Sequence, residues 1–158
     1  MNQNTMHARE AISAALAECY VTIDGNRYNF MQAISLEAKY TKTKVQVPIL
    51  GRPAKGNKST GWKGTGSAKF HFNSSIFRMM MKRFQDTGED IYFDIQVTNE
   101  DATSTVGRQT VILKDCNIDD GILTKFDADS EYLSEEMNFT FEGFELPEEF
   151  ADLDGMRA

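Results

Sequence analysis

Apolar and polar residues alternate along most of this 158-residue chain. Alternation with period two over four to eight residues is typical of a β-strand that buries one face. The clearest example is Ile34–Thr41, in which every second residue is apolar, and it predicts a long strand with one dry face. The same pattern predicts six further strands, at Cys19–Ile23, Ala68–Asn73, Ile91–Thr98, Gly107–Ile118, Gly121–Asp127 and Met137–Phe144.

Turn signals separate several of these segments. Asp24-Gly25 follows the first predicted strand, and an Asp-Gly pair between extended segments favours a tight hairpin turn. Asp119-Asp120-Gly121 predicts a second turn, between the strands Gly107–Ile118 and Gly121–Asp127. The pattern as a whole therefore predicts a mainly β fold of about seven strands.

One segment has the period of a helix instead. Between residues 75 and 86 the apolar side chains recur at a spacing that places them on one helical face. Ser74 or Ser75 can cap the start, and Gly88 stands where a helix commonly ends. We therefore expect one packed α-helix at about residues 75–86. The alanine-rich residues 8–18 form a second, less regular helix pattern.

Composition places the chain among globular proteins. It is 41% hydrophobic and 26% charged, and its length suits one domain. No apolar run reaches the roughly 18 residues that a membrane helix needs. The first 18 residues lack the basic start and apolar stretch of a secretory signal, so we expect a chain made and kept in a cytoplasm. Cys19 and Cys116 are then expected to be reduced thiols in strands.

Charge is distributed unevenly along the chain, whose net charge is −7. Residues 1–84 contain 13 Lys and Arg against 4 Asp and Glu, whereas residues 85–158 contain 4 against 20. Two interpretations stay open. The two parts can pair within one molecule, or a basic surface of one copy can meet an acidic surface of the next. A head-to-tail contact of the second kind builds rings or filaments.

Residues 51–66 form a basic segment that is rich in Gly and Lys and contains Trp62, the one tryptophan of the chain. Long connections inside compact domains are usually functional or disordered. A tryptophan suits the centre of an interface better than a solvated loop. The basic segment is therefore either an arm that binds a partner or a flexible loop.

The basic segment does not match a phosphate-binding loop. Gly51 and Gly56 have the required separation, but Asn57 precedes Lys58, and more glycines follow where a helix should begin. Residues 127–138 start like a calcium-binding loop but lack its central glycine and final glutamate. With two histidines and two cysteines, the sequence contains no metal-ligand spacing or nucleophile triad. We therefore expect no cofactor, no metal and no enzymatic activity.

Two stretches resemble one known family. They are GRPAKGNKSTGWKGTGSAKFHFNSSIFRMMM, which starts at Gly51, and DADSEYLSEEMNFTFEGFELPEEF, which starts at Asp127. In this order they resemble the PBSX-type tail tube proteins of contractile phage tails and phage-derived bacteriocins. The resemblance extends roughly from Cys19 to Phe150. It divides the chain into an N-terminal segment, 1–18, a tail tube domain, 19–150, and a C-terminal tail, 151–158.

The resemblance implies an antiparallel β-sandwich or partly open barrel with one packed helix. Hexameric rings would stack head to tail into the inner tube of a tail, which conducts DNA or punctures the target envelope. The implied partners are further copies of the chain, a tail sheath protein, and baseplate (tail initiator) and tail terminator proteins. DNA would pass without specific binding. The implied location is the tail of a virion or phage-like particle, assembled in the host cytoplasm.

The expected interface residues follow from these two lines of reasoning. In the basic segment they are Arg52, Lys55, Lys58, Trp62, Lys63, Gly64 and Gly66. The expected acidic counterparts on a neighbouring copy are Glu135, Glu136, Glu148 and Glu149. Two other functions stay open: a type VI secretion-like tube that carries effectors, and a nucleic-acid-binding β-barrel that uses Trp62 as a stacking platform.

Overall fold

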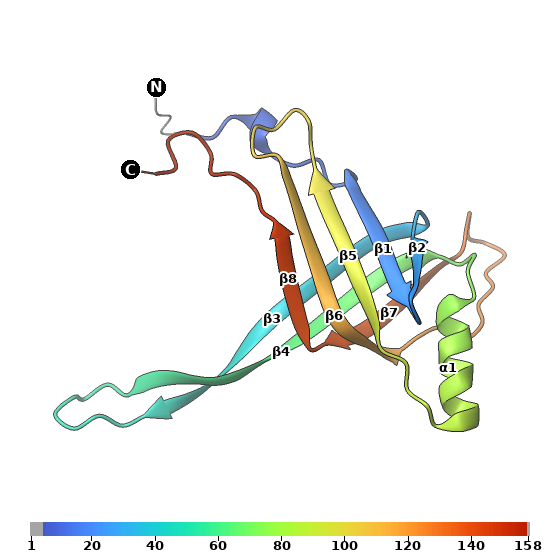
Figure 1. Cartoon of the computed structure of the whole chain (residues 1–158), viewed down its shortest axis with the longest axis horizontal. Coiled ribbons are helices and arrows are strands. Elements are labelled where there is room, and N and C mark those ends of the chain that lie inside the picture. Colours follow the sequence, from blue (N-terminus) through green and yellow to red (C-terminus); the bar gives the residue numbers. More distant parts are fainter. Residues whose placement is uncertain (1–4, 158) are drawn as a thin grey trace. The chain divides into compact units, whose positions relative to one another are not determined.

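The computed structural model describes residues 5–157, and these residues form two compact units. The first unit contains residues 5–31, Tyr92–Asp115 and 143–157, and the second contains Gln32–Ile91 and Cys116–Glu142. Within the described chain there are eight β-strands and one α-helix (Figure 1). The mainly β fold with one helix is therefore confirmed. Residues 1–4 of the expected N-terminal segment lie outside the described residues.

The first unit is an antiparallel sheet with the strand order β2-β1-β5-β6-β8. Its strands are β1 (Ala17–Ile23), β2 (Asn26–Asn29), β5 (Phe93–Glu100), β8 (Gly143–Glu148) and β6 (Arg108–Asp120), which belongs to this unit as far as Asp115. The expected turn at Asp24-Gly25 joins β1 to β2. Both of its residues have positive φ, 50° and 79°, as a two-residue hairpin turn requires.

Apolar pairs across neighbouring strands form the core of the first unit. Val21 of β1 lies opposite Ile95 of β5, and both are 1% exposed. This core also contains a buried polar pair. The hydroxyls of Thr98 and Thr110 lie 3.0 Å apart and form a hydrogen bond. Cys19 in β1 is a free thiol, and burial raises its pKa to about 11.

The second unit has the strand order β6-β7-β4-β3. It contains β3 (Ala33–Val47), β4 (Gly56–His71), β7 (Ser134–Phe141) and β6 from Cys116 onward. Alternation along β7 places Met137, Phe139 and Phe141 on one face, where all three are buried. They lie opposite Ala68, Gly66 and Gly64 of β4, which face the same side of the sheet.

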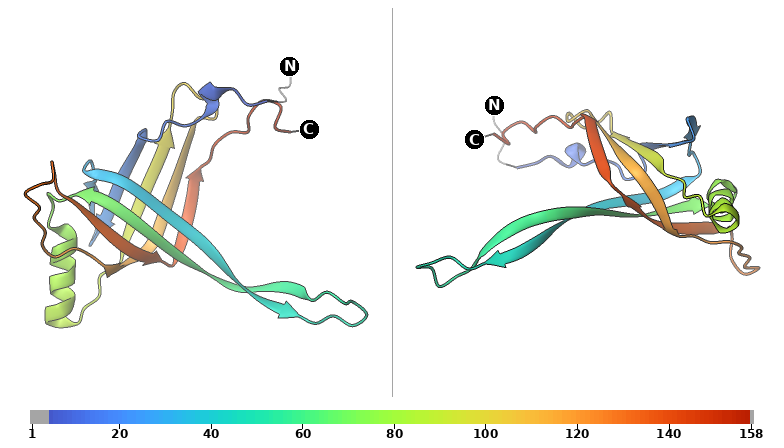
Figure 2. Two further views of the ribbon diagram at one scale, coloured as in Figure 1. Left: turned by 180° about the vertical axis from the view of Figure 1, so that it is seen from behind. Right: turned by 60° about the horizontal axis from the view of Figure 1, so that its bottom comes forward.

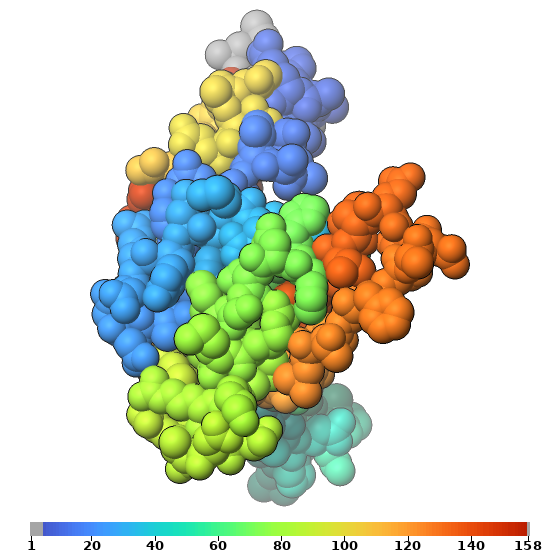
Figure 3. Space-filling model, turned by 90° about the vertical axis from the view of Figure 1, so that its right-hand side faces the viewer, coloured from blue at the N-terminus to red at the C-terminus, as the bar shows by residue number. Residues whose placement is uncertain are grey.

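Helix α1 (Ile76–Thr87) covers part of that apolar face. Phe77 and Met80 are its buried residues, and the Phe77 ring lies 5.4 Å from the ring of Phe70 in β4. The helix ends at Gly88, whose φ of 73° is left-handed, as the sequence predicted. Figure 3 shows α1 in light green next to the orange loop of residues 121–133.

Four predictions from the alternating pattern need correction. Residues 121–127 are not a strand, and the first two residues of the turn expected at Asp119-Asp120-Gly121 are the end of β6. The Met137–Phe144 stretch contributes to two strands, β7 and β8. The apolar face of β3 is not dry, since Ile34 is 41% and Tyr40 is 45% exposed. The reason is that β3 is the end strand of its sheet, so one flank of the strand has no neighbour.

Residues 8–18 are not a long helix. A 3-10 turn at Ala8–Glu10 is the helical part, and β1 already begins at Ala17. Side chains rather than helical packing order this segment. The carboxylate of Glu10 accepts hydrogen bonds from the backbone N–H of Thr105 (3.0 Å) and from the hydroxyls of Thr105 and Ser104. Asp101 accepts a further bond from the backbone N–H of Ser13 at 3.0 Å.

Candidate subunit interface

Most of the basic segment is a strand rather than a loop. β4 begins at Gly56, so residues 48–55 alone connect it to β3. β4 pairs with β7 from Gly64 onward, whereas Gly56–Lys63 pairs with β3 alone. We call residues 42–63 the hairpin arm. In Figures 1 and 2 it continues as a two-stranded ribbon beyond the end of β7.

The hairpin arm is both basic and apolar. Its charged residues are all cations, Lys42, Lys44, Arg52, Lys55, Lys58 and Lys63, and all are exposed. Its tip adds exposed apolar side chains at Val45, Val47, Ile49 and Leu50, of which Leu50 is 103% exposed. This apolar tip was not predicted from the sequence, although the alternation Val45-Gln46-Val47 and the pair Ile49-Leu50 were its signal.

Trp62 lies at the base of the hairpin arm. Its indole stacks on the Tyr40 ring at 4.6 Å with an interplanar angle of 17°, and it lies 6.1 Å from the ring of Phe141. Its residual exposure is 37%. Trp62 therefore packs against its own sheet and leaves about a third of its surface for another molecule.

Gly64 and Gly66 allow aromatic rings of β7 to lie directly over β4. A Cβ atom at Gly64 would stand 2.4 Å from the Phe141 ring, and one at Gly66 would stand 2.3 Å from the Phe139 ring. Real Cβ atoms essentially never approach so closely, so any side chain there would displace a buried ring. The structure thus gives both glycines a packing role within the chain.

Glu135 does not face outward. It is 6% exposed, and its carboxylate accepts a hydrogen bond from the Arg78 guanidinium at 2.8 Å. The prediction that Glu135 binds a cation of a neighbouring copy does not fit this geometry. Glu135 would have to leave Arg78, whose charge would then stay largely buried without a partner. The sequence contained a signal of this burial, since Glu135 alternates with Met137 and Phe139 on one face of β7.

The other predicted acids differ in availability. Glu136 is exposed and lies opposite Lys69 in the β4–β7 register. The Glu148 carboxylate accepts hydrogen bonds from the Arg108 guanidinium at 2.7 Å and from the Thr110 hydroxyl at 3.2 Å. Hydrogen bonding to Arg108 lowers the pKa of the Glu148 carboxyl. Glu149 is exposed. Glu136 and Glu149 are therefore the predicted acids with most of their surface open.

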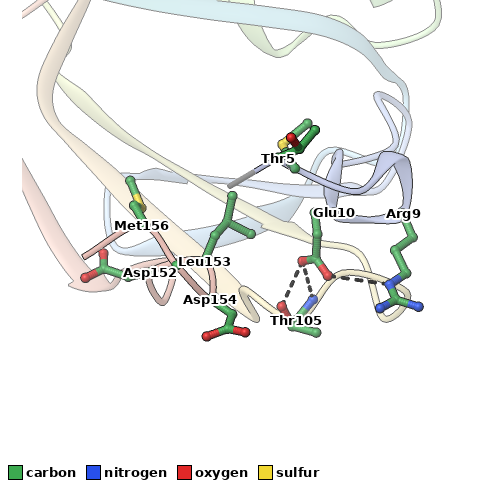
Figure 4. A pocket seen from close by; sticks show the side chains of 10 residues that line it. Thr5, Arg9, Glu10, Thr105, Asp152, Leu153, Asp154 and Met156 are labelled. Atoms are coloured by element: carbon green, nitrogen blue, oxygen red, sulfur yellow. Dashed lines mark hydrogen bonds and ion pairs between the residues drawn. The ribbon is translucent and has the colours of Figure 1, made fainter. Parts of the chain in front are cut away.

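A wide pocket of about 680 Å³ lies within the first unit, between residues 5–10, Thr105 and residues 152–156 (Figure 4). Hydrogen bonds from the backbone and side chain of Thr105 lower the pKa of Glu10, which lines this pocket. A carboxylate held in this way anchors the N-terminal segment. Among residues 5–157, no group of three His, Cys, Asp or Glu side chains could hold a metal ion.

Comparison with known proteins gives one family. A family model described as "Phage tail tube protein" matches residues 4–148. The chain is 41% identical over 118 residues to the phage-like element PBSX protein XkdM of Bacillus subtilis (strain 168), a match that covers 75% of this chain and 80% of the relative.

Two solved structures are similar in fold. One is a chain of the six-fold symmetrised baseplate of the anti-feeding prophage, with TM-score 0.65, 13% identity and coverage of 94% of this chain and 97% of that one. The other is a chain of the PVC sheath-tube complex, an extracellular contractile injection system in its extended state. Its TM-score is 0.57 at 12% identity, over 81% of this chain and 86% of that one. None of the helices in residues 5–157 is long and apolar enough to cross a membrane.

Proposed function

This chain belongs to the phage tail tube protein family, and we propose that its copies form six-membered rings that stack head to tail into the inner tube of a contractile tail. The tube then lies in the tail of a phage or phage-like particle. It conducts DNA or punctures the target envelope. The count of six rests on the six-fold symmetry of the baseplate that contains a chain of similar fold.

The hairpin arm carries this proposal. A two-stranded hairpin is marginally stable in water without further packing. Yet this arm exposes four large apolar side chains at its tip, Val45, Val47, Ile49 and Leu50. Contiguous exposed apolar surface marks an interaction site. The six cations of the arm and the acid-rich second half of the chain give complementary surfaces for a second copy. The arm therefore bridges successive rings.

The long end strand supports closure of each ring. β3 has 15 residues and pairs with β4 on one flank, at the end of the strand order. An exposed edge of this length invites pairing with another chain. A neighbouring copy in the ring satisfies this edge by strand addition. The cations Lys39, Lys42 and Lys44 along β3 keep the isolated subunit from indiscriminate pairing.

The remaining partners follow from the place of such a tube. A sheath protein surrounds it, a baseplate protein starts its growth and a terminator ends it. Passing DNA meets a subunit with net charge −7, and a negative conduit does not retain phosphates. The protein has no turnover of nucleotides, esters, glycosides or peptides. Stoichiometric metal or nucleotide in the purified protein, found by mass spectrometry, would overturn that part of the proposal.

Electron microscopy of the full chain at high concentration, with and without the baseplate initiator, tests the proposal. We expect hollow tubes from the wild type. Reversal of Arg52, Lys55, Lys58 and Lys63 to Glu should prevent growth and leave the unfolding temperature unchanged. Reversal of Arg9 and Arg157, two exposed cations outside the arm, is the control. A wild-type chain that stays monomeric under all these conditions contradicts the proposal.

A further inference from the structure

The second unit contains an apolar pocket with no occupant from its own chain. It has a volume of about 220 Å³ and lies between α1, residues 90–91 and the end of β6. Its apolar walls are Met80, Met81, Phe84, Ile91 and Ile118. Phe84 is 54% exposed although it points along the apolar side of the helix. An apolar cavity of about 150 Å³ can bind a benzene ring, so this pocket can take a branched aliphatic side chain.

The rim of the pocket is acidic. Asp90, Asp119 and Asp120 line it, and all three are exposed. Apolar walls and an acidic rim together select an occupant. It should present an aliphatic side chain with cations next to it in the sequence.

We propose that this pocket receives the tip of the hairpin arm of a second copy, an inference that rests on the proposed function. Leu50 and Ile49 enter between Phe84 and Ile118. Arg52 and Lys55, which follow at once in the sequence, meet the acidic rim.

The tip cannot reach the pocket of its own chain. Asn117 of β6 lines the pocket and lies opposite Thr140 of β7. The next residue of β7, Phe141, lies opposite Gly64 of β4. From Gly64 the strand β4 runs eight residues further to Gly56, and strands rise about 3.3 Å per residue. The tip is thus on the order of 26 Å beyond the level of the pocket. Pairing with β3 as far as Gly56, with one register shift between Thr43 and Lys44, keeps it there. The occupant is another copy.

Cysteine cross-linking tests this contact. Protein carrying Leu50→Cys is mixed with protein carrying Phe84→Cys under mild oxidation, and we expect a disulfide-linked dimer that neither variant gives alone. Met79→Cys is the matched control, because Met79 is 69% exposed on the same helix but does not line the pocket. Equal or stronger linking to Met79→Cys, or no linking to Phe84→Cys, overturns the inference.

Asp119→Lys gives a second readout, because it places a cation on the rim that Arg52 and Lys55 are proposed to meet. Asp119 is exposed, so the unfolding temperature should stay unchanged. The critical concentration for assembly should rise, by up to roughly fivefold, the change that corresponds to one exposed ion pair. An unchanged critical concentration contradicts the proposed contact. Tubes that form normally while both tests fail would refute this contact and leave the proposed function standing, whereas absence of tubes from the wild type refutes the function itself.

Discussion

Arg78 holds three parts of the second unit together, and its removal tests the packing described above. The guanidinium donates to the Glu135 carboxylate at 2.8 Å, to the carbonyl of Ile122 at 3.2 Å and to the carbonyl of Ser74. It also lies over the Phe72 ring, 4.3 Å from its centroid. The side chains of Arg78 and Glu135 are 19% and 7% exposed. The pair is therefore largely removed from water.

Arg78→Met should be strongly destabilising, because it leaves the Glu135 carboxylate buried without its cation. Breaking a buried pair in this way costs about 3–5 kcal/mol. We expect the lower end, about 3 kcal/mol, because the partial exposure of Arg78 lets water reach the site. For a chain of this length each kcal/mol lowers the unfolding temperature by about 2–4 °C. Thermal unfolding followed by circular dichroism should thus show a decrease of about 10 °C.

Two further variants decide whether the buried charge is the cause. Arg83→Met breaks an exposed pair with Glu89, whose side chains are 41% and 58% exposed, and should cost less than about 1 kcal/mol. Arg78→Met combined with Glu135→Leu leaves no buried charge and should recover most of the lost stability. Equal effects of Arg78→Met and Arg83→Met would refute the reasoning. A double variant that is no more stable than Arg78→Met alone would also refute it.

Three other changes test separate parts of the structure. Gly66→Ala should cost about 1–3 kcal/mol in urea unfolding, because its Cβ would meet the buried Phe139 ring, whereas Gly61→Ala has open space and should be near neutral. The lowered pKa of Glu10 means that its stabilisation is complete above about pH 4.5 and is lost as the pH falls through the folded-state pKa. The hydrogen-exchange protection of residues 8–13, which is the intrinsic amide exchange rate divided by the observed rate, should therefore fall in acid, and Glu10→Gln should remove that dependence; protection that is independent of pH in the wild type would contradict this. Trp62→Ala should lower stability by only about 1 kcal/mol but reduce tube growth in electron microscopy, because the base of the hairpin arm loses its aromatic stack; normal tube growth would contradict it.

The sequence predicted those elements whose residues carry a strict period. Alternation located β1, β5, β6 and β7, and the helical spacing located α1 within about a residue at each end. It did not predict residues 56–66 of β4, where Gly and Lys replace the usual strand formers. That stretch is held as a strand by its pairing with β3, and a local pattern does not contain such a long-range contact.

The interface residues were harder to predict for a related reason. Charge alone marked Glu135 as a surface acid, but its partner Arg78 is 57 residues away in sequence. Gly64 and Gly66 looked like loop residues because the rings that require them belong to β7. Trp62 was predicted as an interface residue, and its stacking on Tyr40, which depends on the β3–β4 register, was not predicted. Each error concerns a contact between segments far apart in the chain.

The central claim is that the hairpin arm joins copies of this chain into stacked rings. A cryo-electron microscopy reconstruction of assemblies of the purified wild-type protein tests it most directly. We predict a hollow tube in which the edge of β3 pairs with the neighbouring subunit of the same ring. The tip at Ile49–Leu50 should lie against a subunit of the next ring. A tube in which the arm contacts its own subunit alone, or points free into solvent, would contradict the account.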